Sequence, residues 1–532
     1  MAAKKKETSE NGVRSDSERI GNEVASKNTQ FIMSNRRAGY KTKKDMLKRS
    51  RNDFETSFNK VMAASVDLLA DNLDTEEEEG RGLKIFNADY LEVNKMKREI
   101  SSETMIERLI TRKIQTASPF NTSLSSFQSQ GQGQSLEFNV KFKGSPVSGI
   151  KVTANFSLIA YPSEGSAQNQ ETDREGKVLF HYDSSTWKPE SATFNPKSDF
   201  WPQLTMHPLE TREIELTELP KNGPLDWWQN SIGLYNYDVN AGKGIRIGVI
   251  DTGVGPHPFL SHVNSIGAFI KTKHLSDPKD GLDVSDHGTH VSGIIAARPT
   301  DTSKEYCGIV PGADVFVARV FPKGLNATQA DIAYAIDTLA HQYGVHLINM
   351  SLGDSESSII ELDAIRYAME CGTLCVCAAG NNYGGTVSYP AAYPETVAVS
   401  GLGDLPNKYP PNSISAVFYP SQKDKYSSTT PLYLASYSNV GKEVVCCAPG
   451  TGIISTVPAY DDHEIPYLAM DGTSMASPMA TATIASFLAE LPQYQALPAD
   501  ETRFYFAANV VAPKCVSLNL SPTYQGYGLI HR

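Results

Sequence analysis

From about Leu225 onward, short and almost fully apolar runs alternate with amphipathic stretches, and this pattern constrains the fold more than any other feature of the chain. The runs read as strands buried on both faces. They cover residues 245–250, 315–320, 345–350, 373–379, 396–399 and 444–448. Residues 328–343 place Ile332, Ile336 and Leu339 on one helical face. We therefore expect residues 225–532 to form an α/β domain with a mostly parallel sheet between helices.

The first 116 residues have a different pattern. They begin with a polar stretch that we expect to be disordered over about 25 residues. From Lys44 apolar residues recur at spacings of three and four, which predicts a helix. A strand over 83–93 and a second helix over 103–114 are expected to follow. The interpretation for 1–116 is a partly disordered, mainly helical region.

Residues 117–135 are rich in Ser, Gly and Gln and are typical of a linker. After them the apolar period becomes two, beginning with Leu136, Phe138 and Val140. Several such runs separated by turn signals predict a small β-sandwich over 136–220. Nothing in this module points to chemistry, so binding or spacing is its expected role.

Several polar residues follow the predicted parallel strands, where the crevices of α/β sheets form. Asp251 ends the first strand, and Asn381 follows another strand. His287 opens a predicted helix that Asp286 could cap. Ser474 lies between small residues at the start of an apolar helix, where a peptide backbone could approach its hydroxyl. Each residue alone is more often structural; together they predict one catalytic site.

Four segments in this order resemble the subtilisin-like serine proteases (subtilases) over roughly residues 225–532. They are Val249-Ile250-Asp251-Thr252-Gly253, His287-Gly288-Thr289-His290-Val291-Ser292-Gly293, Ala378-Ala379-Gly380-Asn381 and Gly472-Thr473-Ser474-Met475-Ala476-Ser477-Pro478. The order Asp, His, Ser is the one that subtilisin uses for its catalytic triad. The first 220 residues carry no such match.

The resemblance implies a serine endopeptidase and a role for each residue. Ser474 would be the nucleophile, His287 the general base and Asp251 the residue that orients the imidazole. Asn381 and the backbone N–H of Ser474 would form the oxyanion hole. The resemblance also implies a substrate cleft lined by Ser351, Leu352, Gly353 and Gly380. Ser388 would lie at the floor of the primary pocket, and the segment 406–437 would shape the rim of the cleft.

Three other functions compete with an active peptidase. The first, a hydrolase with a Gly-x-Ser-x-Gly motif, needs a histidine after its serine, and His531 is the only one after Ser474. The second is a catalytically silent or latent subtilase-fold scaffold that binds protein partners. The third is compatible with activity: a peptidase regulated by its N-terminal 220 residues, acting as cleaved propeptide, inhibitor or adaptor. The sequence does not decide between these three roles of the N-terminal residues.

Composition limits the partners, the cellular location and the cofactors that we expect. The net charge of −11 argues against nucleic acid as the main partner. The resemblance implies a protein or peptide substrate, and residues 1–220 could bind a regulatory protein. There is no apolar run of about 20 residues. The first residues do not form a signal peptide, and seven cysteines suggest reduced thiols. These features predict a cytoplasmic location, with leaderless export as the alternative. No cofactor is expected; zinc is disfavoured, and structural calcium has no clear ligand cluster.

Overall fold

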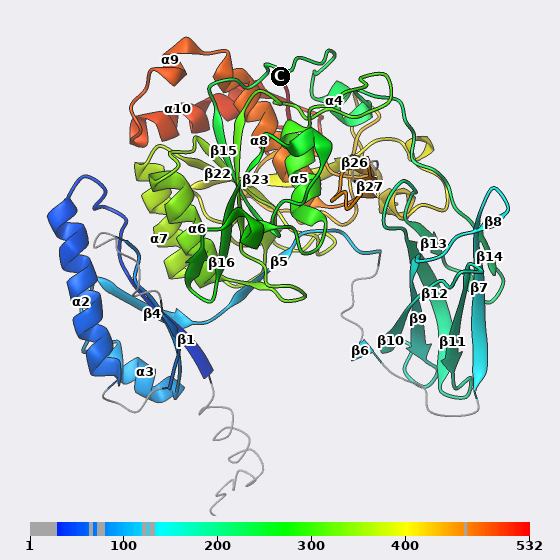
Figure 1. The fold of residues 1–532 in the computed structure, drawn as a ribbon, viewed down its shortest axis with the longest axis horizontal. Coiled ribbons are helices and arrows are strands. Elements are labelled where there is room, and N and C mark those ends of the chain that lie inside the picture. Colours follow the sequence, from blue (N-terminus) through cyan, green and yellow to red (C-terminus); the bar gives the residue numbers. More distant parts are fainter. Residues whose placement is uncertain (1–28, 63–66, 72–79, 120–124, 127–132, 462–464) are drawn as a thin grey trace, which may run out of the picture. The chain divides into compact units, whose positions relative to one another are not determined.

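The computed structural model describes residues 29–62, 67–71, 80–119, 125–126, 133–461 and 465–532 (Figure 1). Two compact units are present, one ending at Leu109 and the other running from Ile110 to Arg532. The segment predicted to be disordered lies outside the described residues, as does most of the predicted linker. In the part of the chain that is described, no helix has the length and apolar character needed to cross a membrane.

The N-terminal unit is an α/β layer and not the mainly helical region expected from the sequence. Its elements are β1 (Thr29–Asn35), α2 (Lys44–Met62), β2 (Asp67–Asp71), β3 (Leu83–Ala88), α3 (Tyr90–Met96) and β4 (Thr104–Arg108). The strands form an antiparallel sheet in the order β2-β3-β1-β4. Phe54, Phe58 and Val61 of α2 belong to a buried cluster that includes Phe31 and Phe86 of the sheet.

The prediction of a helix over residues 103–114 is wrong. Residues 104–108 form β4, which pairs with β1, and residues 111–114 form a separate strand, β5 (Thr111–Ile114). Met105, Ile106 and Ile110 suit a helical spacing, but all three are buried in the extended conformation. Backbone pairing with distant strands decides between the two conformations, because short apolar patterns are ambiguous.

Residues 125–126 and 134–215 form two sheets packed face to face, where the sequence predicts a β-sandwich over 136–220. One sheet has the order β13-β12-β9-β10-β6 and the other β11-β7-β14, with β8 paired to β7. The elements are β6 (Ser125–Ser126), β7 (Gln134–Phe142), β8 (Ser145–Pro146), β9 (Lys151–Leu158), β10 (Gly165–Glu171), β11 (Lys177–Tyr182), β12 (Trp187–Asn195), β13 (Gln203–Thr205) and β14 (Glu213–Glu215). Their inward side chains include Leu136, Phe138 and Phe180 and form one core.

The large C-terminal sheet has the strand order β17-β16-β18-β15-β20-β22-β23-β25-β29-β28, with β24 paired to β23. Its strands are β15 (Arg246–Asp251), β16 (Asn264–Ile270), β17 (Lys273–Leu275), β18 (Asp314–Arg319), β20 (Leu347–Met350), β22 (Leu374–Ala378), β23 (Thr396–Gly403), β24 (Tyr433–Leu434), β25 (Val444–Pro449), β28 (Cys515–Val516) and β29 (Leu529–Ile530). The strands from β16 to β29 run parallel, whereas β17, β24 and β28 pair antiparallel. The six predicted parallel strands are confirmed.

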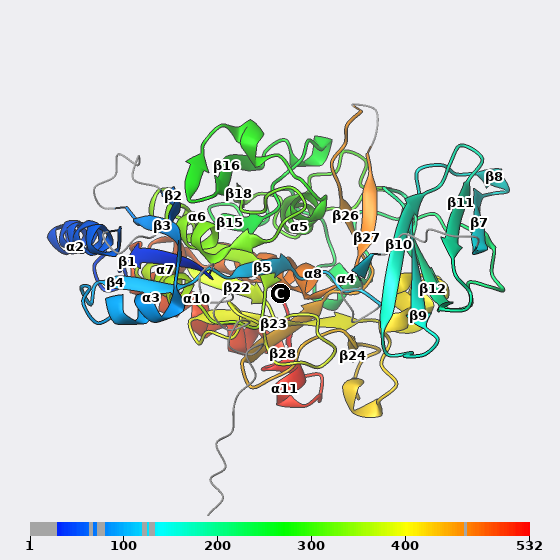
Figure 2. The ribbon, with the colours of Figure 1, turned by 90° about the horizontal axis from the view of Figure 1, so that it is seen from below.

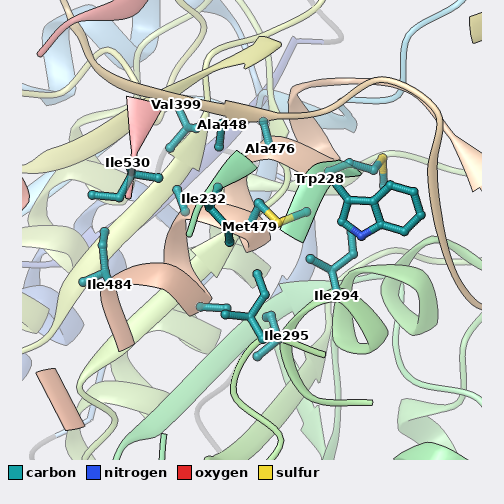
Figure 3. Close-up of a cluster of buried hydrophobic side chains, with 14 of the residues drawn as sticks. Trp228, Ile232, Ile294, Ile295, Val399, Ala448, Ala476, Met479, Ile484 and Ile530 are labelled. Atoms are coloured by element: carbon teal, nitrogen blue, oxygen red, sulfur yellow. The ribbon is translucent and has the colours of Figure 1, made fainter. Parts of the chain in front are cut away.

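Helices cover both faces of this sheet (Figures 1 and 2). Helices α5 (His287–Ala296) and α8 (Thr473–Ala489) contact each other and share a core with Val249 of β15. Helix α6 (Gln329–His341) packs against α7 (Ile359–Glu370), and its Leu339 faces Gly248, on the other side of β15. Figure 3 shows the core around α8, where Met479 lies among side chains from neighbouring elements. The structure is the predicted three-layer α/β domain.

The segment 406–437 connects the β-sandwich to this domain. It contains the short turns η3 (Pro406–Lys408), η4 (Ile414–Phe418) and η5 (Lys423–Lys425). The backbone N–H of Leu204 donates to the carbonyl of Asn412 at 2.9 Å, and that of Ile414 donates to Pro202 at 2.9 Å. The sandwich is therefore held against the sheet domain by main-chain hydrogen bonds.

Candidate active site

The carboxyl ends of three neighbouring strands and the first turns of two helices meet at one place. Asp251 ends β15, Ser351 follows β20, and Asn381 follows β22 after two residues. His287 is the first residue of α5, and Ser474 is the second residue of α8. Because the strands are parallel, their carboxyl ends lie on the same edge of the sheet. The structure thus places the motif residues at one edge of the sheet, with Asp251 hydrogen-bonded to His287 and with Asn381 and Ser474 both hydrogen-bonded to Gln115.

Asp251 and His287 form a buried pair. The Nδ1 atom of His287 lies 2.7 Å from Oδ1 of Asp251, and the two residues are 2% and 0% exposed. The backbone N–H of Thr252 also donates to this oxygen at 2.7 Å. A carboxylate at Nδ1 places the proton of a neutral imidazole there and leaves the lone pair on Nε2. Within the described residues, Nε2 has no hydrogen-bond partner.

The start of α5 differs from the expected cap. Asp286 has a φ of 69° and its side chain makes no capping hydrogen bond. Instead, Oγ1 of Thr252 accepts from the N–H of Gly288 at 2.8 Å, and Asp283 accepts from that of Thr289 at 2.7 Å. A Cβ atom on Gly288 would lie 2.0 Å from the carbonyl oxygen of Gly253. The glycine therefore allows the helix to begin directly against the end of β15.

Ser474 is fully buried and is hydrogen-bonded to Ser351 in both directions. Its Oγ donates to the carbonyl of Ser351 at 3.0 Å, while Oγ of Ser351 donates to the carbonyl of Ser474 at 2.8 Å. Asn349, which the sequence analysis did not single out, fixes this arrangement. Its amide donates to Oγ of Ser351 at 3.0 Å, and its Oδ1 accepts from Ser477 on α8 at 2.8 Å.

The side-chain amide of Asn381 is held in one orientation. Its Oδ1 accepts from both the N–H and the Oγ1 of Thr473, each at 3.0 Å. Its Nδ2 donates to the carbonyl of Gln115. The backbone N–H of Ser474 donates to the same carbonyl at 3.1 Å. Two donors from different elements therefore converge on one carbonyl oxygen, where they could stabilise a negative charge.

The segment that supplies this carbonyl was missed by the sequence analysis. Strand β5 pairs antiparallel with β19 (Ala327–Thr328) on one side and β21 (Leu352–Gly353) on the other. Gln115 continues the pairing, because its N–H donates to Ser351 at 3.1 Å. Two residues further on, the N–H of Ala117 donates to the carbonyl of Asp471 at 2.7 Å. The predicted cleft residues Ser351, Leu352 and Gly353 thus contact an extended segment of the same chain.

Two glycines with positive φ allow close approaches near the site, and Gly472 makes room for this segment. Gly472 has a φ of 144°, and a Cβ on it would lie 2.4 Å from the carbonyl oxygen of Gln115. Gly380 has a φ of 110°, and its Cβ would lie 2.4 Å from Oγ of Ser388. The side chain of Gln115 lies near Gly353, to whose carbonyl its Nε2 donates at 2.8 Å. Gly380 and Ser388 are thus neighbours; their expected role in the primary pocket stays a prediction.

Buried titratable groups surround the site. Burial raises the pKa of Asp471 to about 7, although Gly452 and Ser415 donate hydrogen bonds to its carboxylate. Burial also lowers the pKa of His290 to about 3. The Nε2 atom of His290 lies 3.0 Å from the carbonyl oxygens of both Ile453 and Leu468, which gives this histidine a structural role. Among the described residues, no group of three or more His, Cys, Asp or Glu side chains could hold a metal ion.

Comparison with known proteins gives the family. Residues 242–510 match the Subtilase family, and this match covers half of the chain. The chain belongs to the subtilase family. Within it, the chain is similar to a thermophilic serine proteinase of Bacillus sp. (strain AK1), with 36% identity over 49% of this chain and 56% of that protein. It is also similar to the Halolysin-like extracellular serine protease Nep of Natrialba magadii, with 36% identity over 48% of this chain and 40% of that protein.

A third subtilase, Subtilisin Savinase of Lederbergia lenta, is 28% identical over 46% of this chain and 76% of its own length. The matched part of this subtilase chain spans about half the length of the first two relatives. The family match covers residues 242–510, so the N-terminal unit and the whole β-sandwich lie outside it.

Proposed function

We propose that this subtilase is a serine endopeptidase whose triad is Asp251, His287 and Ser474. The observation that carries the proposal is the position of the Gln115 carbonyl, which accepts from the N–H of Ser474 and from Nδ2 of Asn381. A peptide carbonyl held by two donors beside a serine hydroxyl is poised for acyl transfer. The buried Asp251–His287 pair supplies the base and its orienting carboxylate.

The chemistry follows from these positions. Oγ of Ser474 leaves the carbonyl of Ser351 by rotation about its Cα–Cβ bond and transfers its proton to Nε2 of His287. It attacks the substrate carbonyl carbon, and the resulting oxyanion takes the two donors of the hole. The C–N bond breaks as His287 returns the proton to the departing amine. Water, deprotonated by His287, then hydrolyses the acyl-serine ester and regenerates Ser474.

We further propose that residues 110–117 are the first substrate. They occupy the cleft as an added strand, which is a recurrent mode of peptide recognition. Counting from the carbonyl in the hole, the bond to be cut joins Gln115 to Thr116. Residues 1–115 are then a removable inhibitory segment. The β-sandwich stays with the peptidase domain, because it lies after the cut and is hydrogen-bonded to residues 412–414.

Expected substrates of the released enzyme are proteins and peptides that bind in extended form. The predicted cytoplasmic location and a regulatory partner for residues 1–220 stay predictions. One relative is named an extracellular protease. Six of the seven cysteines are buried, which is compatible with either location.

The proposed activity is tested with a fluorophosphonate probe, which forms a covalent bond with an activated serine. We expect the wild-type protein to be labelled and to cut a peptide library, and Ser474→Ala to do neither. The exposed Ser303→Ala variant, remote in sequence from the site motifs, is the matched control and should behave as wild type. Wild-type protein that stays unlabelled and cuts no peptide would favour the latent scaffold instead.

A further inference from the structure

A buried ion pair joins the segment in the cleft to the peptidase domain. The side chains of Arg112 and Glu361 are both 0% exposed. The Nη2 atom of Arg112 lies 2.6 Å from Oε2 of Glu361, and its Nε lies 3.1 Å from Oε1. The remaining terminal nitrogen, Nη1, donates to the carbonyl of Glu356 at 2.7 Å. All three guanidinium nitrogens are therefore hydrogen-bonded.

The backbone of Glu361 is held at the start of a helix. It lies in the first turn of α7, whose N-terminal end favours a negative charge. The Oγ atom of Ser358 accepts from its backbone N–H at 3.0 Å and caps the helix. The nearby thiol of Cys375 stays neutral near pH 7, because burial, and then the charge of Glu361, raise its pKa to about 12. The carboxylate is thus a buried negative charge facing Arg112.

The position of Arg112 in the cleft is set by the strand register. Gln115 supplies the carbonyl in the oxyanion hole, so Arg112 is the fourth residue before the bond to be cut. Register pairs Arg112 with Ala327 and Lys113 with Gly353. Lys113 differs sharply, because its side chain is 64% exposed and lies 3.5 Å from Asp354. Exposed pairs of this kind select weakly, whereas a buried, bidentate pair selects strongly.

We propose that Glu361 makes this enzyme select substrates with arginine at the fourth residue before the cut bond. This proposal rests on the proposed endopeptidase function and names its substrate class. A substrate with an apolar residue at that place would leave Glu361 buried without a countercharge. Lysine would bring the charge but not the planar fork that fits both carboxylate oxygens and the Glu356 carbonyl. The pKa of Arg112 agrees: burial opposes its charge, but Glu361 outweighs burial and the pKa is raised.

The test starts from the full-length protein and lets it cleave itself. Fluorophosphonate labelling then measures the fraction of active enzyme. Its substrates are the peptide Thr-Arg-Lys-Ile-Gln-Thr-Ala-Ser, which is residues 111–118, and versions of it with Arg112→Lys or Arg112→Ala. Cleavage at the Gln–Thr bond is followed by mass. We expect kcat/KM to fall about 10-fold for the lysine peptide and on the order of 10²-fold for the alanine peptide.

Two enzyme variants separate selection from folding. Glu361→Gln keeps the shape of the side chain and should reduce the preference for arginine over alanine to under about 10-fold, while the alanine peptide is cut at a similar rate. The matched control, Asp354→Asn, should keep the full preference. If Glu361→Gln fails to fold, the rates at which the wild-type enzyme cuts the arginine, lysine and alanine peptides test the proposal by themselves. A labelled wild type that cuts the three peptides equally overturns this proposal only, whereas an unlabelled, inactive wild type overturns the proposed function as well.

Discussion

Replacing His287 with alanine is expected to lower kcat for peptide hydrolysis by on the order of 10⁶-fold, the loss measured when the triad histidine of subtilisin is removed. In the proposed mechanism His287 takes the proton of Ser474, and its Nε2 atom has no partner among the described residues. Without it the hydroxyl is a weak nucleophile. Substrate binding and the proposed oxyanion hole remain, so hydrolysis should still be faster than the uncatalysed reaction in water.

The control for this loss is His181→Ala, which removes an exposed histidine from strand β11 of the sandwich and should leave kcat unchanged. Both variants are compared by steady-state kinetics at equal protein concentration. Thermal melting shows whether His287→Ala, which leaves Asp251 buried without its imidazole partner, is still folded. A folded His287→Ala variant within about 10-fold of wild type would exclude His287 as the general base.

Replacing Asn381 with alanine is expected to lower kcat by on the order of 10² to 10³-fold, with a much smaller effect on KM. Its Nδ2 and the N–H of Ser474 share one carbonyl oxygen, and their attraction grows as that oxygen becomes negative. The donor therefore stabilises the transition state more than the bound substrate. The measurement is a full saturation curve for each variant.

Asn382→Ala is the matched control, since Asn382 is the exposed neighbour of Asn381 and should keep wild-type kcat. Asn381→Ala also removes the acceptor of two Thr473 hydrogen bonds, at a cost of roughly 1–3 kcal/mol in stability. Thermal melting detects that loss separately. A folded Asn381→Ala variant whose kcat stays within threefold of wild type would contradict the assigned oxyanion hole.

The peptidase domain could be predicted from the sequence because its signals are local. Each parallel strand is a short apolar run, and Asp251, Asn381 and Ser474 stand at strand ends or a helix start. Sheet geometry then brings such residues together without further information. The cap of α5 was the exception, since Thr252 and Asp283 replace Asp286 through contacts that depend on the tertiary fold.

The segment in the cleft could not be predicted in the same way. Strand β5 has only four residues, and its partners β19 and β21 lie more than 200 residues further along the chain. Its sequence, Thr-Arg-Lys-Ile, carries no alternation that separates a strand from a helix. The pairing of Arg112 with Glu361 has the same origin, because only the tertiary fold brings the two side chains together.

The central claim is that the chain holds its own Gln115–Thr116 bond at Ser474. Intact-mass analysis of the purified wild-type protein, with Ser474→Ala alongside, tests it most directly. We predict that wild type yields a fragment ending at Gln115 and a second beginning at Thr116, while Ser474→Ala stays at full length. Cleavage of Ser474→Ala at the same bond, or a labelled, active wild type that remains whole at this bond, would contradict the claim.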